Sequence, residues 1–529
     1  MIISVIPAVL MILLAEGIGI WTLDLMHVER EGYSAPVGTA VLFCILQLVY
    51  LPALLLHWNI LYSNIASAVV LVLCLYFPLK RRKDIRTSLF RRESIYILVS
   101  AALFIYLLSN YDINVIMNSD FELARMNSLL GSGHIFLDTF HLQGYTLLGT
   151  FFNWADLSGE SVMAVYILGI LIHCISAMLY LNIIDSFSLR NPWFKFTIVA
   201  GALFYLNFYS WKIAGAFHGS NWRIVFIAMM LFCAYQWIRR ENEQIKYLLL
   251  FFSGAGMFCH PSFSILSLEI ILCVTVFTFH EEKIRSLFDF TTFIIPNVIY
   301  CACLFGYGYA WVGWLLIAAY TAFCFMRYKK KPRRMLVRAE DFLIEHHAKI
   351  FLVAIPAAAV AITLFSRMFF PELTIPYSRY LKFFNIKPAK IYLFLHSSAL
   401  DMILNVIRWL GFILLLAMAK DRENRMVRYL YLLMAVFFLN PLCMGIIAKT
   451  IGTVTYAGEF EILFNPFTDI VIFVALYHVF EWKTLLQWVL EIALVFAALA
   501  GHIGSFMRKP FGLYTDLLQD SEVVVEMEQ

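Results

Sequence analysis

The residues best suited to chemistry in this sequence are two carboxylates, Asp120 and Glu122, which are separated by one residue. They directly follow a strongly apolar run and open a polar stretch that continues to Glu160. Polar groups beside a membrane are costly, so a carboxylate pair at such a boundary indicates a functional site. In a chain with so few charges, such a pair marks the place where chemistry is expected.

The same residues also have a purely structural interpretation. Ser119 and Glu122 have the spacing of a capping box, in which the two side chains satisfy backbone N–H groups at a helix start. Asp120 in the first turn would interact favourably with the helix dipole. If the helix begins at Ser119, Asp120 and Glu122 lie about 200° apart around it, so they do not face one site. We therefore expect one catalytic acid, Asp120, and leave the capping interpretation open beside it.

Two short helices are expected in the polar loop 111–160. The first covers residues 120–130, where apolar side chains recur at helical spacing, and the glycines Gly131 and Gly133 end it. The second covers residues 144–154, which are apolar but too few to span a bilayer. Both helices are predicted to lie at the outer membrane surface.

The composition places these segments in a membrane protein. Hydrophobic residues make up 62% of the 529 residues and charged residues only 14%, whereas soluble domains carry about 25% charged residues. At roughly 20 residues per span, we predict an all-α integral membrane protein, a polytopic helical bundle with about 14–16 transmembrane helices. The ten cysteines lie in or beside apolar runs, which argues against a disulfide framework.

Two basic clusters set the expected orientation of the chain. Residues 80–92 follow an early apolar run, residues 327–338 lie in mid-chain, and both are rich in Lys and Arg. Short basic loops stay on the cytoplasmic side, and an even number of predicted spans separates the two clusters. This parity places the loops 111–160, 369–400 and 449–463 on the outer face, and it places the N-terminus outside.

Polar residues on the predicted outer loops are candidates for binding a sugar or a phosphate. The loop 211–222 combines aromatic side chains with hydrogen-bond donors, although Trp and basic residues also concentrate at membrane interfaces. A tight turn holds His260, for which a simple turn with a capping Ser262 is the alternative interpretation. The candidate substrate-binding residues are Glu122, Arg125, Lys212, His218, Asn221, Arg223, His260 and Arg379.

The order of these elements resembles the GT-C superfamily of integral membrane glycosyltransferases. Those families carry an acidic motif in a large outer loop just after a span, followed by surface helices and a Gly-Tyr or Tyr-Pro element. The matching residues in this chain are Asp120-x-Glu122, Ala124-Arg125, Asp138-Thr139-Phe140 and Gln143-Gly144-Tyr145. The likeness covers residues 94–280 and extends to the rest of the chain only by the number of spans.

The chain departs from the GT-C pattern in several places. The acidic motif follows the fourth predicted span instead of the first, and Thr146 stands where a proline follows the tyrosine. The late outer segment 457–459 contains no arginine at the place where some similar bacterial families have an aromatic–arginine element. We expect the chain to consist of three parts. These are an N-terminal part with transmembrane helices and a basic loop (1–93), a GT-C-like core (94–340) and C-terminal transmembrane helices (341–529).

The resemblance implies transfer of a sugar from a polyprenyl-phosphate-linked donor to a cell-envelope or exopolysaccharide acceptor at the outer face. Asp120 would act as general base with inversion at the anomeric carbon. Arg125, Lys212, Arg223 or Arg379 would bind the leaving phosphate. No cofactor is implied beyond the lipid-linked donor, and no metal site is assigned, with a divalent ion left open.

The partners implied are membrane lipid, the polyprenyl-phosphate-linked saccharide and other envelope-assembly proteins, with no nucleic acid. The location implied is the bacterial plasma membrane, with a multi-pass chain. Two alternatives stay open: a non-catalytic GT-C-like subunit of a polysaccharide-assembly complex, and a transporter or flippase of lipid-linked saccharide. A transporter should carry intramembrane charges and broken helices, and few such charges stand out in this sequence.

Overall fold

The computed structural model describes the greater part of the first 300 residues and shorter parts of the remainder. The described residues are 2–30, 32–55, 58–109, 119–134, 144–155, 162–187, 189, 191–204, 219–239, 243–260, 262–282, 284–300, 315, 318–320, 322, 338, 342, 345–346, 353, 355–369, 413, 426–427, 430, 461–462 and 465–479. Every element among these residues is helical, and they contain no strand.

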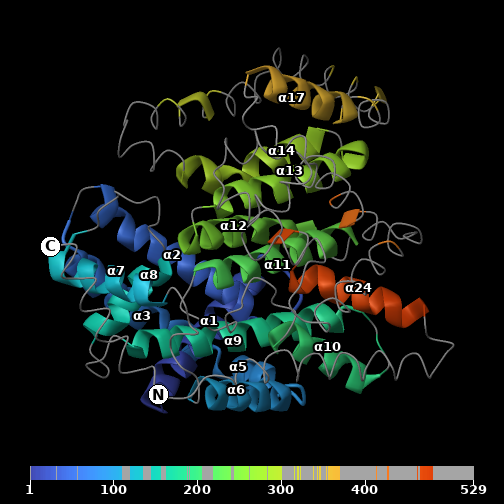
Figure 1. The fold of residues 1–529 in the computed structure, drawn as a ribbon. Helices are drawn as coiled ribbons and strands as arrows, with labels where there is room; N and C mark the ends of the chain where they lie inside the picture. The colour runs from blue at the N-terminus through green and yellow to red at the C-terminus, as the bar shows by residue number, and fades with distance from the viewer. Residues whose placement is uncertain are drawn as a thin grey trace.

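Apolar helices form the body of the molecule (Figure 1). The helices up to residue 185 are α1 (Ile2–Leu25), α2 (Ala35–Leu55), α3 (Ile60–Cys74), α4 (Tyr76–Lys80), α5 (Arg82–Leu89), α6 (Ser94–Ser109), α7 (Ser119–Ser132), α8 (Gly144–Trp154) and α9 (Val162–Asp185). The later helices are α10 (Pro192–Phe204), α11 (Gly219–Ile238), the 3-10 helix η2 (Glu243–Tyr247), α12 (Leu248–Cys259), α13 (Phe263–Glu282), α14 (Ile284–Phe293), α17 (Ile355–Phe369) and α24 (Pro466–Val479).

Three described helices are long and apolar enough to cross a membrane: Ser4–Leu25, Ile60–Lys80 and Tyr166–Asp185. Shorter apolar helices accompany them in α2, α6, α11, α13 and α24. Figure 1 shows α9, α11, α12, α13 and α17 as successive, roughly parallel layers of one bundle. A bundle of this composition is consistent with a membrane protein, because a helix needs about 20 apolar residues to cross the hydrocarbon core.

The first two helices are in unusually close contact. A Cβ atom placed on Gly38 of α2 would lie 1.7 Å from the carbonyl oxygen of Ala15 in α1, so only glycine allows this approach. Small residues let helix backbones pack closely in this way inside a membrane. The backbone N–H of Ser34 donates to a carboxylate oxygen of Glu16 at 3.2 Å, just before α2 begins. Glu16 therefore satisfies backbone donors at the start of the neighbouring helix.

Ion pairs gather several connecting segments at one end of the bundle, which we name the basic face. Arg30, in the connection between α1 and α2, pairs with Asp24 and lies 3.5 Å from Asp84 of α5. Arg81 lies 2.7 Å from Asp24 and 3.4 Å from Asp84. These contacts hold the connection after α1 against the segment around α5. The predicted parity of the spans places both segments on one side, in agreement with this contact.

The other end of the bundle, which we name the opposite face, collects a different set of segments. The N–H of Ile60, at the start of α3, donates to the carbonyl of Gly133 at 2.7 Å. The Tyr50 hydroxyl of α2 lies 2.8 Å from Asn64 of α3 and 3.4 Å from the Leu147 carbonyl of α8. The connection between α2 and α3 thus meets the end of α7 and the helix α8. The predicted parity places these segments together on the outer side.

The two helices predicted in the first large outer loop are both present, but one packs differently from the prediction. α7 ends as expected at Gly133, whose φ of +68° is a conformation that favours glycine, and whose N–H donates to the Leu129 carbonyl at 3.0 Å. α8 was predicted to lie at the surface, yet Leu147, Thr150 and Phe152 are buried and α8 contacts α3, α9 and α12. α8 is apolar around most of its circumference, so the bundle covers more than one of its faces.

Replacement of Gly133 by alanine should destabilise the protein by about 1–2 kcal/mol, because the left-handed conformation is costly for any residue with a Cβ atom. The new Cβ would also lie 2.5 Å from the Asn59 side chain. Thermal unfolding in detergent measures this loss. Gly131→Ala is the matched control, since a Cβ there meets nothing within 4 Å and alanine favours a helix. Equal stability of the two variants would contradict this account of the end of α7.

Candidate functional site

Four polar side chains form a buried cluster at the opposite face, which we name the Arg223 network: Arg223, His260, Ser262 and Glu461. Arg223 lies in the second turn of α11, His260 directly follows α12, Ser262 directly precedes α13, and Glu461 precedes α24. Relative exposure is 4% for Arg223 and 0% for Glu461. Four helices therefore meet at one nearly water-free group of polar side chains.

The centre of the network is a bidentate ion pair between Arg223 and Glu461. The Arg223 Nε donates to Glu461 Oε2 at 2.5 Å, and Nη2 donates to Oε1. The remaining guanidinium nitrogen, Nη1, donates to Ser262 Oγ at 2.7 Å and lies 3.2 Å from His260 Nδ1. A bidentate pair of this kind fixes geometry as well as charge. Burial raises the pKa of the Glu461 carboxyl, and the adjacent Arg223 guanidinium acts in the opposite direction.

The hydrogen bonds around His260 indicate a neutral imidazole. The N–H of Ser262 donates to His260 Nδ1 at 3.2 Å, and Ser262 Oγ lies 2.7 Å from the same nitrogen. Because Arg223 already donates to Ser262 Oγ, the hydroxyl proton is directed to Nδ1. Nδ1 is then an acceptor, which places the ring proton on Nε2.

The local sequence at the start of α24 explains how Glu461 is positioned in the network. Asn465 caps α24, since its Oδ1 accepts from the N–H groups of Phe467 and Thr468 at 3.0 and 3.1 Å, and Pro466 occupies the first helical position. The Asn465 Nδ2 also donates to the Glu461 carbonyl at 3.0 Å. The side chain that starts α24 therefore holds the turn that carries Glu461.

Close packing of Phe263 forms the turn at His260. A Cβ atom on Gly256 would lie 2.2 Å from the Phe263 ring, so the glycine leaves the space that this ring occupies. The N–H of Phe263 donates to the His260 carbonyl at 3.0 Å. The chain thereby reverses between α12 and α13, and Ser262 comes to face His260.

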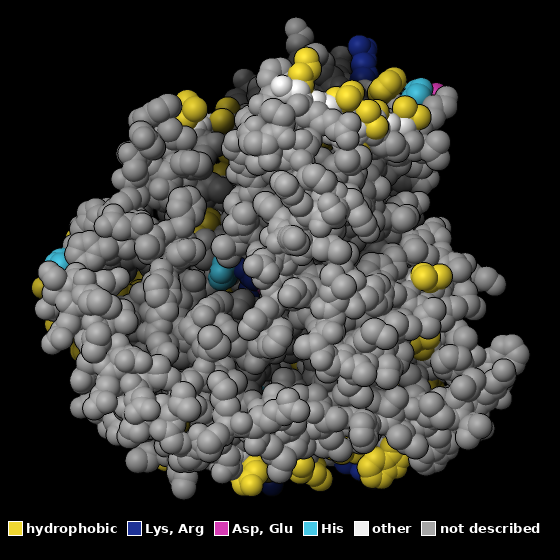
Figure 2. Space-filling view, viewed as in Figure 1, with side chains coloured by type: hydrophobic (Ala, Val, Ile, Leu, Met, Phe, Trp, Pro, Cys, Tyr) yellow, Lys and Arg dark blue, Asp and Glu magenta, His cyan; other side chains and the backbone are white. Residues whose placement is uncertain are grey.

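An aromatic cluster adjoins the network on its bundle side. The Phe43 ring of α2 lies 4.9 Å from the ring of Trp222, 6.0 Å from that of Phe226 and 5.8 Å from that of Phe258. Trp222 directly precedes Arg223 on α11, so the aromatic cluster and the network share this part of the helix. Figure 2 shows histidine and cationic side chains together in a hollow, at the level where α11 and α12 lie in Figure 1.

The structure brings two of the residues predicted from sequence into direct contact, Arg223 and His260. The backbone positions of four others are described on helices at the same face: Asp120, Glu122 and Arg125 on α7, and Asn221 in the first turn of α11. Their side chains, and with them the predicted capping box, lie outside the described residues, as do Lys212, His218 and Arg379. The substrate-binding role predicted for these residues stays a prediction.

The network also contains a residue that the sequence did not single out. Glu461 lies 238 residues from Arg223 in the chain, and no local motif links the two. The only sequence feature that could have pointed to Glu461 was its place in a predicted outer loop, just before an Asn-Pro helix start. Since Arg223 is engaged with Glu461, it can bind a substrate phosphate only if that pair opens. As it stands, the network joins α11, α12, α13 and α24.

Comparisons of this chain with family models, with curated proteins and with solved structures found no match. The GT-C resemblance therefore depends on the residues quoted for it and on the order of the helices.

Glu461→Gln and Arg223→Gln should each destabilise the protein by about 3–5 kcal/mol, because each leaves a buried charged partner uncompensated. The double variant should lose less than the sum of the two single losses, since the two residues share one interaction. Thermal unfolding in detergent of the wild type, the two single variants and the double variant completes this double-mutant cycle. Additive losses would contradict direct coupling between the two side chains.

Proposed function

We propose that this protein is a multi-pass plasma-membrane glycosyltransferase of the GT-C type, with about 14–16 spans. It would transfer a sugar from a polyprenyl-phosphate-linked donor to a cell-envelope or exopolysaccharide acceptor, with Asp120 as the general base. The observation that carries the proposal is the placement of α7, which bears Asp120, at the same face as the Arg223 network. α7 packs on α8, and α8 contacts α12, whose end bears His260.

The position of Asp120 near the start of α7 would keep its carboxylate in the ionised form that can accept a proton. A helix N-terminus carries partial positive charge, which favours the ionised carboxylate. The far end of α7 is fixed to α3 by the hydrogen bond between Gly133 and Ile60. A helix held at one end on a rigid bundle can keep its first turn at a constant distance from a lipid-linked donor.

The proposed reaction assigns a role to each charged group. Asp120 takes the proton of the acceptor hydroxyl, and that oxygen attacks the anomeric carbon of the donor sugar. The bond from this carbon to the phosphate oxygen breaks, and the lipid phosphate leaves with the bonding electrons. Arg125, Lys212 or Arg379 neutralises the charge that builds on the phosphate. Arg223 is held by Glu461, so we assign it a positioning role, with α11 and α12 as the elements it fixes.

A non-catalytic GT-C-like subunit is the second candidate. It is favoured by the engagement of Arg223 with Glu461, because this cation is neutralised where a leaving phosphate would need it. Substitution of Asp120 separates the two candidates, since a subunit would keep its function without the carboxylate.

Asp120→Asn should abolish the glycan or polysaccharide output that the wild-type gene restores to a deletion strain, because general bases contribute about 100- to 10,000-fold to rate. Ser128→Ala, an exposed position further along α7, is the control and should restore output fully. Immunoblots of membrane fractions must show equal amounts of both proteins. Normal output from the Asp120→Asn protein at equal amount rejects the catalytic role.

The proposed orientation places the basic face in the cytoplasm and the opposite face outside. Cysteines introduced at two exposed sites, Phe90→Cys on the basic face and Ser128→Cys on α7, test it. In intact cells an impermeant maleimide should label Ser128→Cys and leave Phe90→Cys at the background of the parent protein. Permeabilisation should expose both. The reverse pattern would overturn the orientation.

A further inference from the structure

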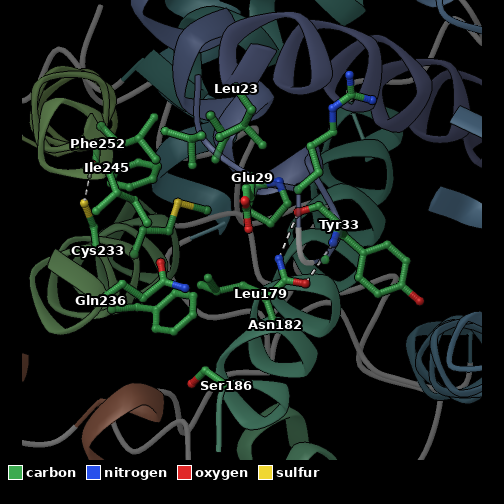
Figure 3. A pocket seen from close by; sticks show the side chains of 18 of the residues that line it. Leu23, Glu29, Tyr33, Leu179, Asn182, Ser186, Cys233, Gln236, Ile245 and Phe252 are labelled. Atoms are coloured by element: carbon green, nitrogen blue, oxygen red, sulfur yellow. Dashed lines mark hydrogen bonds between the residues drawn. The ribbon is translucent and has the colours of Figure 1, made fainter. Parts of the chain in front are cut away.

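A cavity of about 200 Å³ lies at the basic face, at the other end of the bundle from the Arg223 network (Figure 3). It lies between the ends of α1, α2, α9, α11 and α12 and is closed on one side by the connection between α1 and α2. One part of its wall is apolar and includes Leu23, Leu179, Phe232, Ile245, Leu248 and Phe252. This wall resembles the lining of a binding pocket for the apolar part of a ligand.

The other part of the wall is polar, and two of its side chains have no polar partner among the described residues. Glu29 and Gln236 line the cavity, and neither makes a hydrogen bond or an ion pair within the part of the chain that the structure describes. In Figure 3 the Glu29 carboxylate and the Gln236 amide are turned toward the same space. Ser186 adds a hydroxyl oxygen whose own proton is donated to the Ile183 carbonyl at 2.7 Å. The polar wall therefore offers acceptors, one of them charged, beside the donor groups of Arg30 and of the Gln236 amide.

Other contacts hold this cavity in shape. Asn182 Nδ2 donates to the Tyr33 carbonyl at 2.8 Å, and its Oδ1 accepts from the Tyr33 N–H at 2.8 Å. A Cβ atom on Gly32 would lie 2.0 Å from the same Oδ1, so a larger residue there would displace the Asn182 side chain from the clamp. This clamp fixes the connection that carries Glu29, and a preformed site loses less entropy when a ligand binds.

Most of the charges at the rim are engaged, and Glu29 differs from them. Arg30 is paired with Asp24 and Asp84, and Asp185 is paired with Lys195 at 2.8 Å. Each of these pairs is neutral, and Arg239 donates to the Ser186 carbonyl at 3.0 Å. The Glu29 carboxylate has no ion-pair partner among the described residues. A carboxylate next to an apolar pocket attracts a positively charged ligand and repels an anionic one.

We propose that this cavity binds a primary alkylammonium group, with its N–H groups on Glu29, Gln236 and Ser186 and its alkyl part against the apolar wall. An ammonium group has three donors and no acceptor, which suits the three oxygen acceptors of Glu29, Gln236 and Ser186. A cavity of about 150 Å³ holds benzene, so this volume accommodates an alkyl chain of roughly six carbons. The ammonium group can come from a free amphiphilic amine or from an amino lipid head group. The inference is independent of the proposed glycosyl transfer.

Thermal unfolding of the purified full-length protein in detergent tests the proposal with n-hexylamine, n-hexanol and hexanoate as probes. Hexylamine should raise the unfolding temperature in a saturable manner, and the other two should not. Glu29→Gln should weaken hexylamine binding about tenfold or more, because it removes a charge-assisted hydrogen bond. Glu93→Gln, at the same face but outside the cavity lining, is the matched control and should bind as the wild type does.

A second variant keeps the test decisive if Glu29→Gln fails to fold. Val37 lines the cavity, and Val37→Phe should abolish the hexylamine shift by filling the space. Nanodiscs of phosphatidylethanolamine and of phosphatidylglycerol separate the sources: stabilisation by the first alone assigns an amino lipid, and equal stability in both assigns a free amine. Equal shifts with hexanol and hexylamine, or unchanged binding by both cavity variants, would overturn the proposal.

Discussion

The arrangement of the opposite face depends on the buried pair of Arg223 and Glu461. Neither charge is tolerated alone in a nearly water-free position, so each holds the segment that carries the other. Through this pair, α24 is joined to α11, and through Ser262 and His260 the same guanidinium reaches the turn between α12 and α13. A segment near the end of the chain is thereby fixed to helices from its middle.

Both ends of the bundle contain polar contacts that differ in exposure. At the opposite face one guanidinium and one carboxylate are enclosed by helices and an aromatic wall. At the basic face the pairs among Arg30, Arg81, Asp24 and Asp84 are half-exposed, where ion pairs contribute little stability. The basic face also contains a buried pair, since Lys246 of η2 donates to Asp289 of α14 at 2.5 Å and both side chains are almost fully buried. The clamp of Asn182 on Tyr33 adds two hydrogen bonds beside the cavity.

Much of the helical framework follows from the sequence, because long apolar runs define spans and glycine defines where α7 ends. The bounds of α8 were also predictable, but its burial was not, since only the neighbouring helices decide which of its faces are covered. For the site, Arg223 and His260 could be singled out as polar residues on predicted outer loops. The contact of Arg223 with Glu461, and that of Glu16 with the Ser34 N–H before α2, could not be predicted because both are tertiary interactions without a local pattern.

A cryo-EM map of the protein in nanodiscs that contain a polyprenyl phosphate tests the proposed function most directly. The account predicts phosphate density at the opposite face, within hydrogen-bond reach of Arg125, Lys212 or Arg379 and beside the carboxylate of Asp120. An Asp120 side chain enclosed by apolar residues, or polyprenyl phosphate bound only at the basic face, would contradict it.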